Sequence, residues 1–178
     1  MDFRFYQAND CSAIEGLFVA TFSESEGEEE GLLIGNLARE MMVDTDHRDL
    51  YGFVAVDAEQ LVAAIFFSRL TFEHNMEAFI LAPVAVHPDY QGKGIGQALI
   101  RHGLRELTRQ GIEFVATYGD PAFYAKVGFQ AVSQNAIQAP HELSQPEGWL
   151  GQSLTDKSLA AIRGRCDCVQ ALDNPAYW

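Results

Sequence analysis

The sequence predicts a single α/β domain over residues 1–178, in which helices alternate with strands in the middle and hairpins lie towards the ends. Two observations predict this class. Several segments of strand length are apolar throughout or alternate between apolar and polar residues, and other segments repeat apolar residues at helical spacing. No internal repeat or low-complexity linker divides the chain, and its length suits one domain.

The N-terminal part predicts a strand and two helices. Residues 3–6 have the composition of a short strand. Asn9, Asp10 and Ser12 are candidate caps of the first helix, and Ser12 with Glu15 fits a capping box. An acidic run at residues 24–30 precedes a second segment of helical periodicity at residues 33–41. Carboxylates suit a helix N-terminus, but we interpret this run as a solvated face.

A hairpin and a buried strand are expected next. Residues 51–56 and 61–72 are strand candidates, and the turn between them predicts a hairpin. Residues 77–87 are nearly all apolar, which is typical of a central strand covered on both faces. Pro83 cannot donate to a ladder, so a bulge or a local loss of pairing is predicted there.

The C-terminal half predicts one long helix, one short helix and several strands. The long helix occupies residues 94–110 and ends at Gly111, a typical C-cap. Asp120 is expected to cap the short helix 122–127, which Pro121 begins. The expected strands are residues 112–117, 129–132, 149–154 and 165–171.

Composition narrows the classes of partner. The chain has 12 Lys and Arg against 25 Asp and Glu, a formal net charge of −13, which disfavours nucleic acid. The same charge suits a cationic amine, although solubility alone also explains it. No signal peptide is visible, and the longest apolar run, residues 78–86, is too short to cross a bilayer. We therefore expect a cytoplasmic protein without a membrane partner.

Cysteine and histidine patterns predict neither disulfides nor a metal. The three cysteines are Cys11, Cys166 and Cys168, an odd and sparse set. Cys166 and Cys168 are expected to share one face of a strand as buried structural thiols. The five histidines show no metal-ligand spacing, so no metal site is predicted.

A glycine-rich stretch, "HPDYQGKGIGQALI" from His87, lies between the buried strand and the long helix. Such a junction presents unpaired N–H groups and the positive end of the helix dipole, and glycines let an anion approach. The alternative is a tight turn without a ligand. A Walker loop is excluded because Gly94 follows Lys93, and a dinucleotide fingerprint is excluded because Gln97 and Leu99 occupy its last glycine position.

Two motifs together resemble the GNAT superfamily of N-acetyltransferases. The first, Gln/Arg-x-x-Gly-x-Gly/Ala, is matched by Gln91, Gly94 and Gly96. The second, a tyrosine four residues before Gly-Phe, is matched by Tyr124 in "GDPAFYAKVGF". The specific resemblance covers residues 81–130. The Gly-Asp-Pro-x-x-Tyr form is similar to a branch of small bacterial acetyltransferases of mostly unknown substrate.

The resemblance implies a mixed, mostly antiparallel central sheet, splayed between its fourth and fifth strands and flanked by helices. Acetyl-CoA would lie in that splay. Its pantetheine arm would pair with the fourth strand as an extra strand does, and its pyrophosphate would bind the glycine loop. The implied binding residues are Val84, Ala85, Val86, Gln91, Gly92, Lys93, Gly94, Ile95, Gly96, Gln97, Phe123 and Tyr124.

The implied reaction moves acetyl from the CoA thioester to the amine of a small molecule or peptide. Tyr124 would give a proton to the leaving thiolate, and its alternative role is packing. Glu77 is a candidate base, with Glu73, His74 or a water chain as alternatives. A non-catalytic acyl-CoA-binding or regulatory module and a nucleotide-binding loop are competing functions. A homodimer is a further expectation.

Overall fold

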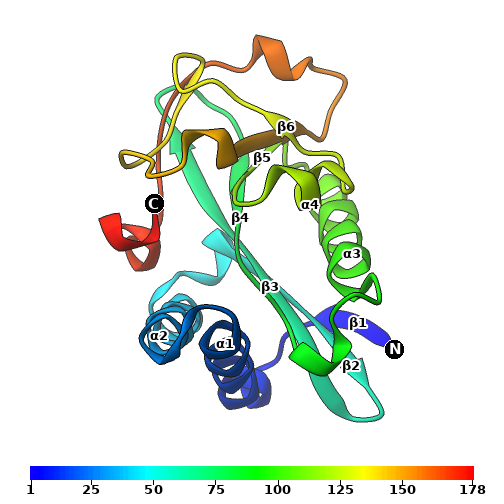
Figure 1. Cartoon of the computed structure of the whole chain (residues 1–178). Coiled ribbons are helices and arrows are strands. Elements are labelled where there is room, and N and C mark those ends of the chain that lie inside the picture. The colour runs from blue at the N-terminus through cyan, green and yellow to red at the C-terminus, as the bar shows by residue number, and fades with distance from the viewer. The chain divides into compact units, whose positions relative to one another are not determined.

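The computed structural model describes the whole chain, residues 1–178 (Figure 1). It divides into two compact units, one of Met1–Phe66 with Pro83–Gly103 and one of Phe67–Ala82 with Leu104–Trp178. Strands β3 (Gln60–Phe72) and β4 (Ala78–Val86) each contribute one part to each unit. The single domain expected from the sequence stays a prediction.

The first unit combines a sheet edge with two packed helices. Strands β1 (Asp2–Phe5) and β2 (Leu50–Asp57) pair antiparallel, and β3 and then β4 follow in the sheet. Helices α1 (Cys11–Glu26) and α2 (Glu28–Asp44) lie side by side in Figure 1. Their close approach needs small residues, because a Cβ on Gly35 would lie 2.3 Å from Cγ2 of Val19.

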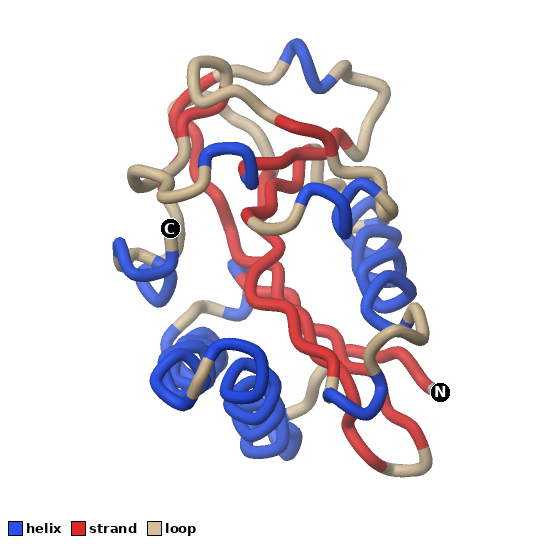
Figure 2. The backbone as a smooth tube through the Cα atoms, in the orientation of Figure 1, coloured by secondary structure: helices blue, strands red, loops and turns tan.

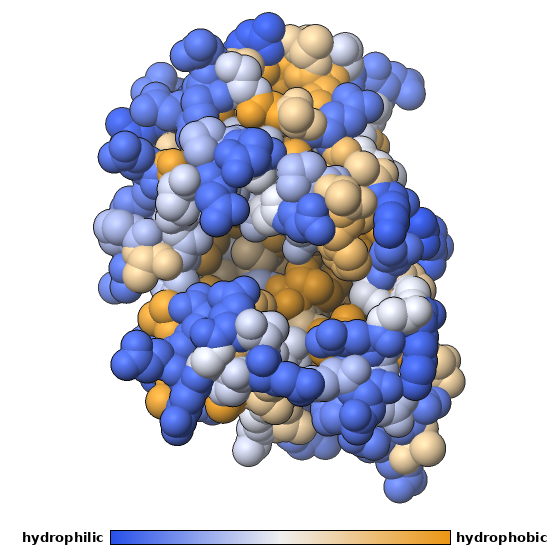
Figure 3. Space-filling model, viewed as in Figure 1, coloured by the Kyte–Doolittle hydropathy of each residue, from blue (hydrophilic) through white to orange (hydrophobic).

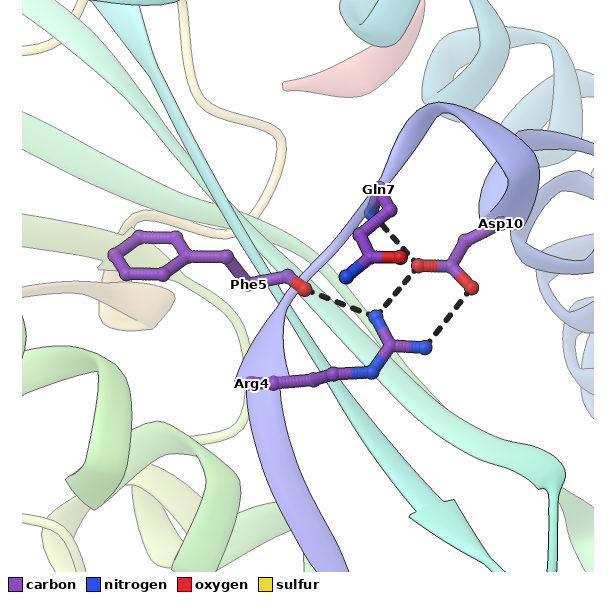
Figure 4. A network of polar contacts seen from close by, with 4 residues as sticks. All are labelled: Arg4, Phe5, Gln7 and Asp10. Atoms are coloured by element: carbon purple, nitrogen blue, oxygen red, sulfur yellow. Dashed lines mark hydrogen bonds and ion pairs between the residues drawn. The ribbon is translucent and has the colours of Figure 1, made fainter.

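The N-cap of α1 is Asp10, one of the predicted candidate caps, and the helix does not begin with the predicted capping box of Ser12 and Glu15. The helix begins at Cys11, and the side chain beside its start belongs to Asp10, which is buried. Asp10 accepts the backbone N–H of Gln7 at 2.7 Å and two bonds from Arg4, at 2.7 and 3.0 Å (Figure 4). The capping box was wrong because a charge-assisted bidentate pair between Asp10 and Arg4 of β1 holds the start of the helix instead. The sequence does not show this pair, because the two side chains meet only in the folded chain.

We expect Asp10→Asn to lower the free energy of unfolding by ~1–3 kcal/mol, because the amide cannot accept both guanidinium bonds. The hydrogen bond from Arg4 holds the pKa of Asp10 below its ordinary value, against the opposing effect of burial. A lowered pKa stabilises the fold above about pH 4. This stabilisation is lost as pH falls through the lowered pKa.

The measurement is chemical denaturation of both proteins between pH 7 and strongly acidic pH. The stability difference should be constant near neutrality and shrink in acid. Asp46→Asn is the matched control, because Asp46 also accepts a backbone N–H and two side-chain bonds from Arg48 but is exposed. A larger loss in the Asp46 variant than in the Asp10 variant would contradict the assignment.

The second unit continues the sheet. Strand β5 (Phe114–Tyr118) pairs parallel with β4, and β8 (Trp149–Ser153) pairs antiparallel with β5 and with β6 (Gln130–Ala131). Strand β9 (Gly164–Asp167) pairs antiparallel with β3 and parallel with β7 (Ile137–Gln138). The predicted mixed, mostly antiparallel sheet with flanking helices is confirmed.

Helices α3 (Ile95–Arg109) and α4 (Pro121–Ala125) lie near their predicted positions. Figure 2 shows that the remaining C-terminal chain consists mainly of loops and short turns. The strand predicted at residues 165–171 is too long, since β9 ends at Asp167. Beyond it the backbone bonds within a 3₁₀ turn, where the Leu172 N–H donates to the Val169 carbonyl, so it has no ladder partner.

Hydrophilic residues cover most of the face shown in Figure 3. Part of the acidic run lies at a helix N-terminus, because Glu28, Glu29 and Glu30 occupy the first turn of α2. Their carboxylates suit the positive end of the helix dipole there. No helix in the chain has both the length and the apolar character needed to span a bilayer.

Candidate active site

The glycine loop of the first unit joins β4 to α3. Its first turn is fixed by His87, whose Nδ1 accepts the N–H of Asp89 at 3.2 Å. Gly92 and Gly94 have φ of +73° and +77°, a conformation that favours glycine. A Cβ at either position would meet nothing within 4 Å, so the backbone conformation, not crowding, requires glycine here.

The loop leaves a run of backbone donors without partners. The Ala98 N–H is the first in the helix to be used, and it donates to the Gly94 carbonyl at 3.0 Å. The N–H groups of residues 92–97 donate to no acceptor in the chain. The positive end of the α3 dipole lies at the same place. This arrangement fits an anion such as a pyrophosphate.

Lys93 adds a positive charge that is held against the loop. Its Nζ donates to the Asp89 carbonyl at 2.9 Å and lies 5.0 Å from the centre of the Tyr90 ring. The side chain is exposed, so an anion on the loop could draw the ammonium away from these partners. Lys93 therefore supplements the backbone donors without being needed to form them.

The backbone hydrogen-bonding groups of β4 do not alternate regularly between the β3 side and the β5 side of the strand. The Leu81 carbonyl accepts the Thr117 hydroxyl of β5 at 2.8 Å, whereas the His87 N–H donates to the Val62 carbonyl of β3 at 2.8 Å. Alternate residues of a strand point to opposite edges, and Leu81 and His87 are an even number of residues apart. An irregularity must lie between them, as predicted at Pro83.

Beyond Leu81, β4 continues beside β3 but has no ladder partner on the edge that faced β5. The pairing with β5 ends at Leu81 and Thr117. The Val86 carbonyl accepts side-chain bonds instead, from Gln91 Nε2 at 3.0 Å and the Thr21 hydroxyl at 3.4 Å. The backbone edge of residues 84–86 that points away from β3 is thus open to an extended ligand. The side-chain amide of Gln91, which was predicted to bind the co-substrate, thus donates to the backbone of β4.

Tyr124 belongs to the second unit and sits on α4. Asp120 caps this helix as predicted, its Oδ1 accepting the Ala122 N–H at 2.9 Å. The Tyr124 ring packs edge-on against Phe123 and Phe129, with centroids 5.0 and 5.8 Å away. Burial raises the pKa of Tyr124 above its ordinary value, against the effect of the Thr117 hydroxyl bond. The phenol therefore remains a proton donor at neutral pH.

Gly119 is a site residue that sequence reasoning missed. A Cβ there would lie 2.7 Å from Cε2 of Tyr124, so only glycine leaves the ring its place. The Gly119 N–H donates to the Gly148 carbonyl at 3.0 Å, which holds the end of β5. The signal was available, because Gly119 is the first residue of the Gly-Asp-Pro motif.

The predicted candidate bases gather at the β3–β4 connection, away from the tyrosine. Glu77 pairs with Arg69 Nη1 at 2.8 Å. Glu77 lies four residues, roughly 13 Å along an extended strand, before Leu81. Leu81 is the residue of β4 whose carbonyl accepts the hydroxyl of Thr117, which also bonds Tyr124. His74 Nε2 contacts the Arg163 carbonyl at 2.8 Å, and Glu73 is exposed. The structure does not bring these groups together with Tyr124, and the base role stays a prediction.

Comparisons with known proteins agree with this geometry. Residues 48–131 match the family model described as acetyltransferase (GNAT) domain. The chain is 31% identical over 140 residues to the Escherichia coli K12 protein named uncharacterized N-acetyltransferase YjhQ, covering 75% of this chain and 77% of that protein. It is 28% identical to uncharacterized N-acetyltransferase YhbS of the same strain, covering 72% and 73% of the two chains.

Solved structures share the fold. The crystal structure of the GNAT family N-acetyltransferase YhbS from Escherichia coli in complex with CoA has a TM-score of 0.84 at 24% identity, covering 97% of this chain and 92% of that one. A GNAT family acetyltransferase from Brucella melitensis in complex with acetyl-CoA has a TM-score of 0.76 at 22% identity and covers 97% of both chains. The chain belongs to the GNAT family of N-acetyltransferases.

Proposed function

We propose that this protein transfers the acetyl group of acetyl-CoA to an amine. One observation carries the proposal: the free N–H groups of residues 92–97 at the start of α3, in a chain of the GNAT family. A run of free donors at a helix N-terminus is a binding site for phosphate groups. Relatives solved with CoA or acetyl-CoA support the choice of that ligand.

Two segments of the first unit would hold the co-substrate. The pyrophosphate would accept hydrogen bonds from the glycine loop, residues 92–97. The pantetheine arm would pair with the open edge of residues 84–86, in the manner of an added strand. The thioester supplies an activated acyl group, and a backbone N–H near Val84 or Ala85 is the candidate donor to its carbonyl oxygen, with Val84 on the open edge of β4.

The chemistry assigned to this chain's own residues centres on Tyr124. A neutral amine attacks the acetyl carbonyl, the carbon–sulfur bond breaks, and the sulfur takes the Tyr124 proton. The amine must lose a proton before or during attack. Asp120 is committed to capping α4, and Glu77 is paired with Arg69. Transfer of that proton to water is compatible with these contacts.

A non-catalytic acyl-CoA-binding module is the alternative, since the Asp120 carboxylate near Tyr124 caps α4 and the candidate base Glu77 is paired with Arg69. The two functions separate in a paired experiment. Calorimetry measures CoA binding, and release of free thiol from acetyl-CoA is followed over a panel of small amines, polyamines and peptides. Thiol release that depends on one class of amine is the expected result. Tight CoA binding without thiol release from any amine would support the module instead.

The raised pKa of Tyr124 predicts the shape of the pH profile. A donor whose pKa lies above 10 keeps its proton up to about pH 10, and the acceptor amine is increasingly neutral as pH rises. Turnover should therefore rise with pH and then level off, without a descending limb below about pH 10. Rates with a saturating amine between pH 6 and 10 test this. A descending limb near pH 8 would contradict Tyr124 as the acid.

Location, oligomeric state and the charge of the acceptor complete the proposal. We infer a cytoplasmic location, which cell fractionation tests, and a homodimer, which light scattering of the purified chain tests. The acidic surface and its net charge of −13 suit a cationic acceptor. Raising the salt concentration should then raise KM for the amine.

A further inference from the structure

Two segments that are distant in the sequence meet at the edge of the second unit. Strands β7 and β9 pair in parallel, with Ile137 opposite Gly164 and Gln138 opposite Arg165. Continuing this register places His141 opposite Cys168. The Cys166 thiol, two residues before Cys168 and on β9, donates to the Gln138 carbonyl at 3.4 Å, which shows how close the two segments are.

A third residue, Asp173, completes a cluster with His141 and Cys168. Asp173 follows the 3₁₀ turn Gln170–Leu172, and its Oδ1 lies 2.6 Å from His141 Nε2. One nitrogen, one sulfur and one oxygen of the three side chains all lie within 4.8 Å of one another.

The C-terminal tryptophan holds the segment that carries Asp173. Trp178 Nε1 donates to the Leu172 carbonyl at 3.0 Å, and the indole is only 6% exposed. Its ring lies 6.0 Å from that of His141 and stacks on Tyr118 at 6.2 Å. The cluster is therefore supported on two sides by packed structure, as a metal site requires.

We propose that His141, Cys168 and Asp173 bind one divalent cation of the zinc class, with water as a fourth ligand. A donor set of imidazole nitrogen, thiolate sulfur and carboxylate oxygen is typical for Zn²⁺. The thiol proton passes to solvent as sulfur binds the ion. The thiolate and the carboxylate then carry two negative charges, which the ion neutralises.

Metal binding requires only small shifts of the three ligand atoms. Ligand bonds of ~2.0–2.3 Å in a tetrahedron place neighbouring ligand atoms about 3.3–3.8 Å apart. The widest separation in the cluster must close by about 1 Å, and the His141–Asp173 hydrogen bond must open into two metal bonds. An ion can enter, because His141 also lines a cavity of about 880 Å³ and Asp173 is exposed.

The three ligands would join the β7–β9 edge to the C-terminal segment, and the water position would stay open to exchange. The spacing of the histidines predicted no metal site, and that prediction considered neighbours in sequence. His141 and Cys168 become neighbours only in the folded chain, each three residues beyond the paired stretch of β7 and β9. The proposal is independent of acetyl transfer and can be tested without CoA or an amine.

The test is titration of the chelator-treated, reduced full-length protein with Co²⁺, which takes zinc sites and reports a thiolate ligand by a charge-transfer band in the near ultraviolet. We expect one Co²⁺ per chain, a thiolate band, and displacement of Co²⁺ by Zn²⁺. Cys168→Ser should abolish the band. Asp173→Asn should weaken Co²⁺ binding by at least ~10-fold, because losing even an outer-shell partner of a metal costs ~10–100-fold.

Cys166→Ser is the matched control, since this thiol lies two residues before Cys168 but outside the cluster, and it should leave the band unchanged. Circular dichroism verifies that each variant is folded, and Asp173→Asn, at an exposed position, keeps the test valid if Cys168→Ser is not. The absence of a thiolate band in the wild-type protein, or an equal band in Cys168→Ser, would overturn the proposal.

Discussion

Replacing Gly94 with valine is expected to weaken CoA binding by about 10²–10⁴-fold while leaving the protein folded. At a φ of +77° a β-branched residue is strained, and relief of that strain turns the loop N–H groups away from the ligand. Each hydrogen bond to a charged phosphate contributes ~1.5–3 kcal/mol, so losing two accounts for this range. Calorimetry with CoA measures the effect.

Gly111→Val is the matched control. Gly111 follows the other end of α3, has a φ of +83°, and like Gly94 has nothing within 4 Å of an added Cβ. Both variants carry the same kind of backbone strain and should lose similar thermal stability. Only the Gly94 variant should lose CoA affinity. Unchanged affinity there, or an equal loss in both, would remove the glycine loop as the pyrophosphate site.

Tyr124→Phe is expected to lower turnover by ~10²–10⁴-fold, the contribution of a positioned general acid, with little change in CoA affinity. The phenylalanine ring keeps the edge-on contacts with Phe123 and Phe129, so only the hydroxyl is tested. Steady-state rates and calorimetry on the same preparation separate the two effects.

Tyr118→Phe is the companion variant. The Tyr118 hydroxyl accepts the Gln145 N–H at 2.7 Å and contacts the Ser144 hydroxyl at 3.1 Å, so its loss should lower stability more than turnover. If Tyr124→Phe retains full turnover, the tyrosine is a packing residue and another group protonates the sulfur.

The glycine loop and the capped helix α4 could be predicted because their signals are local. Positive φ at Gly92 and Gly94, the start of α3 and the Asp120 cap are each encoded within a few neighbouring residues. The irregularity of β4 was likewise predictable, since Pro83 lacks an N–H group. Family resemblance then connected these local features with a ligand.

Contacts that depend on strand pairing could not be predicted. The bond between Arg4 and Asp10 displaced a plausible capping box because β1 presents the guanidinium to the helix start. The ion pair between Glu77 and Arg69 could not be seen either, because it forms across the connection of two strands. Burial of Cys166 was predicted correctly, and burial raises its pKa to about 12. The same prediction for Cys168 was wrong, because the strand ends at Asp167 and Cys168 is only half-buried.

A ligand site formed by backbone groups has a consequence for mutational scanning. The unused donors of residues 92–97 belong to the main chain, so replacing Lys93 or Gln97 with alanine removes none of them. An alanine scan of this loop would report sharp losses only at glycines whose conformation alanine cannot adopt. Side-chain diversity among active variants should be wide here, and tolerance to substitution would be a poor guide to importance.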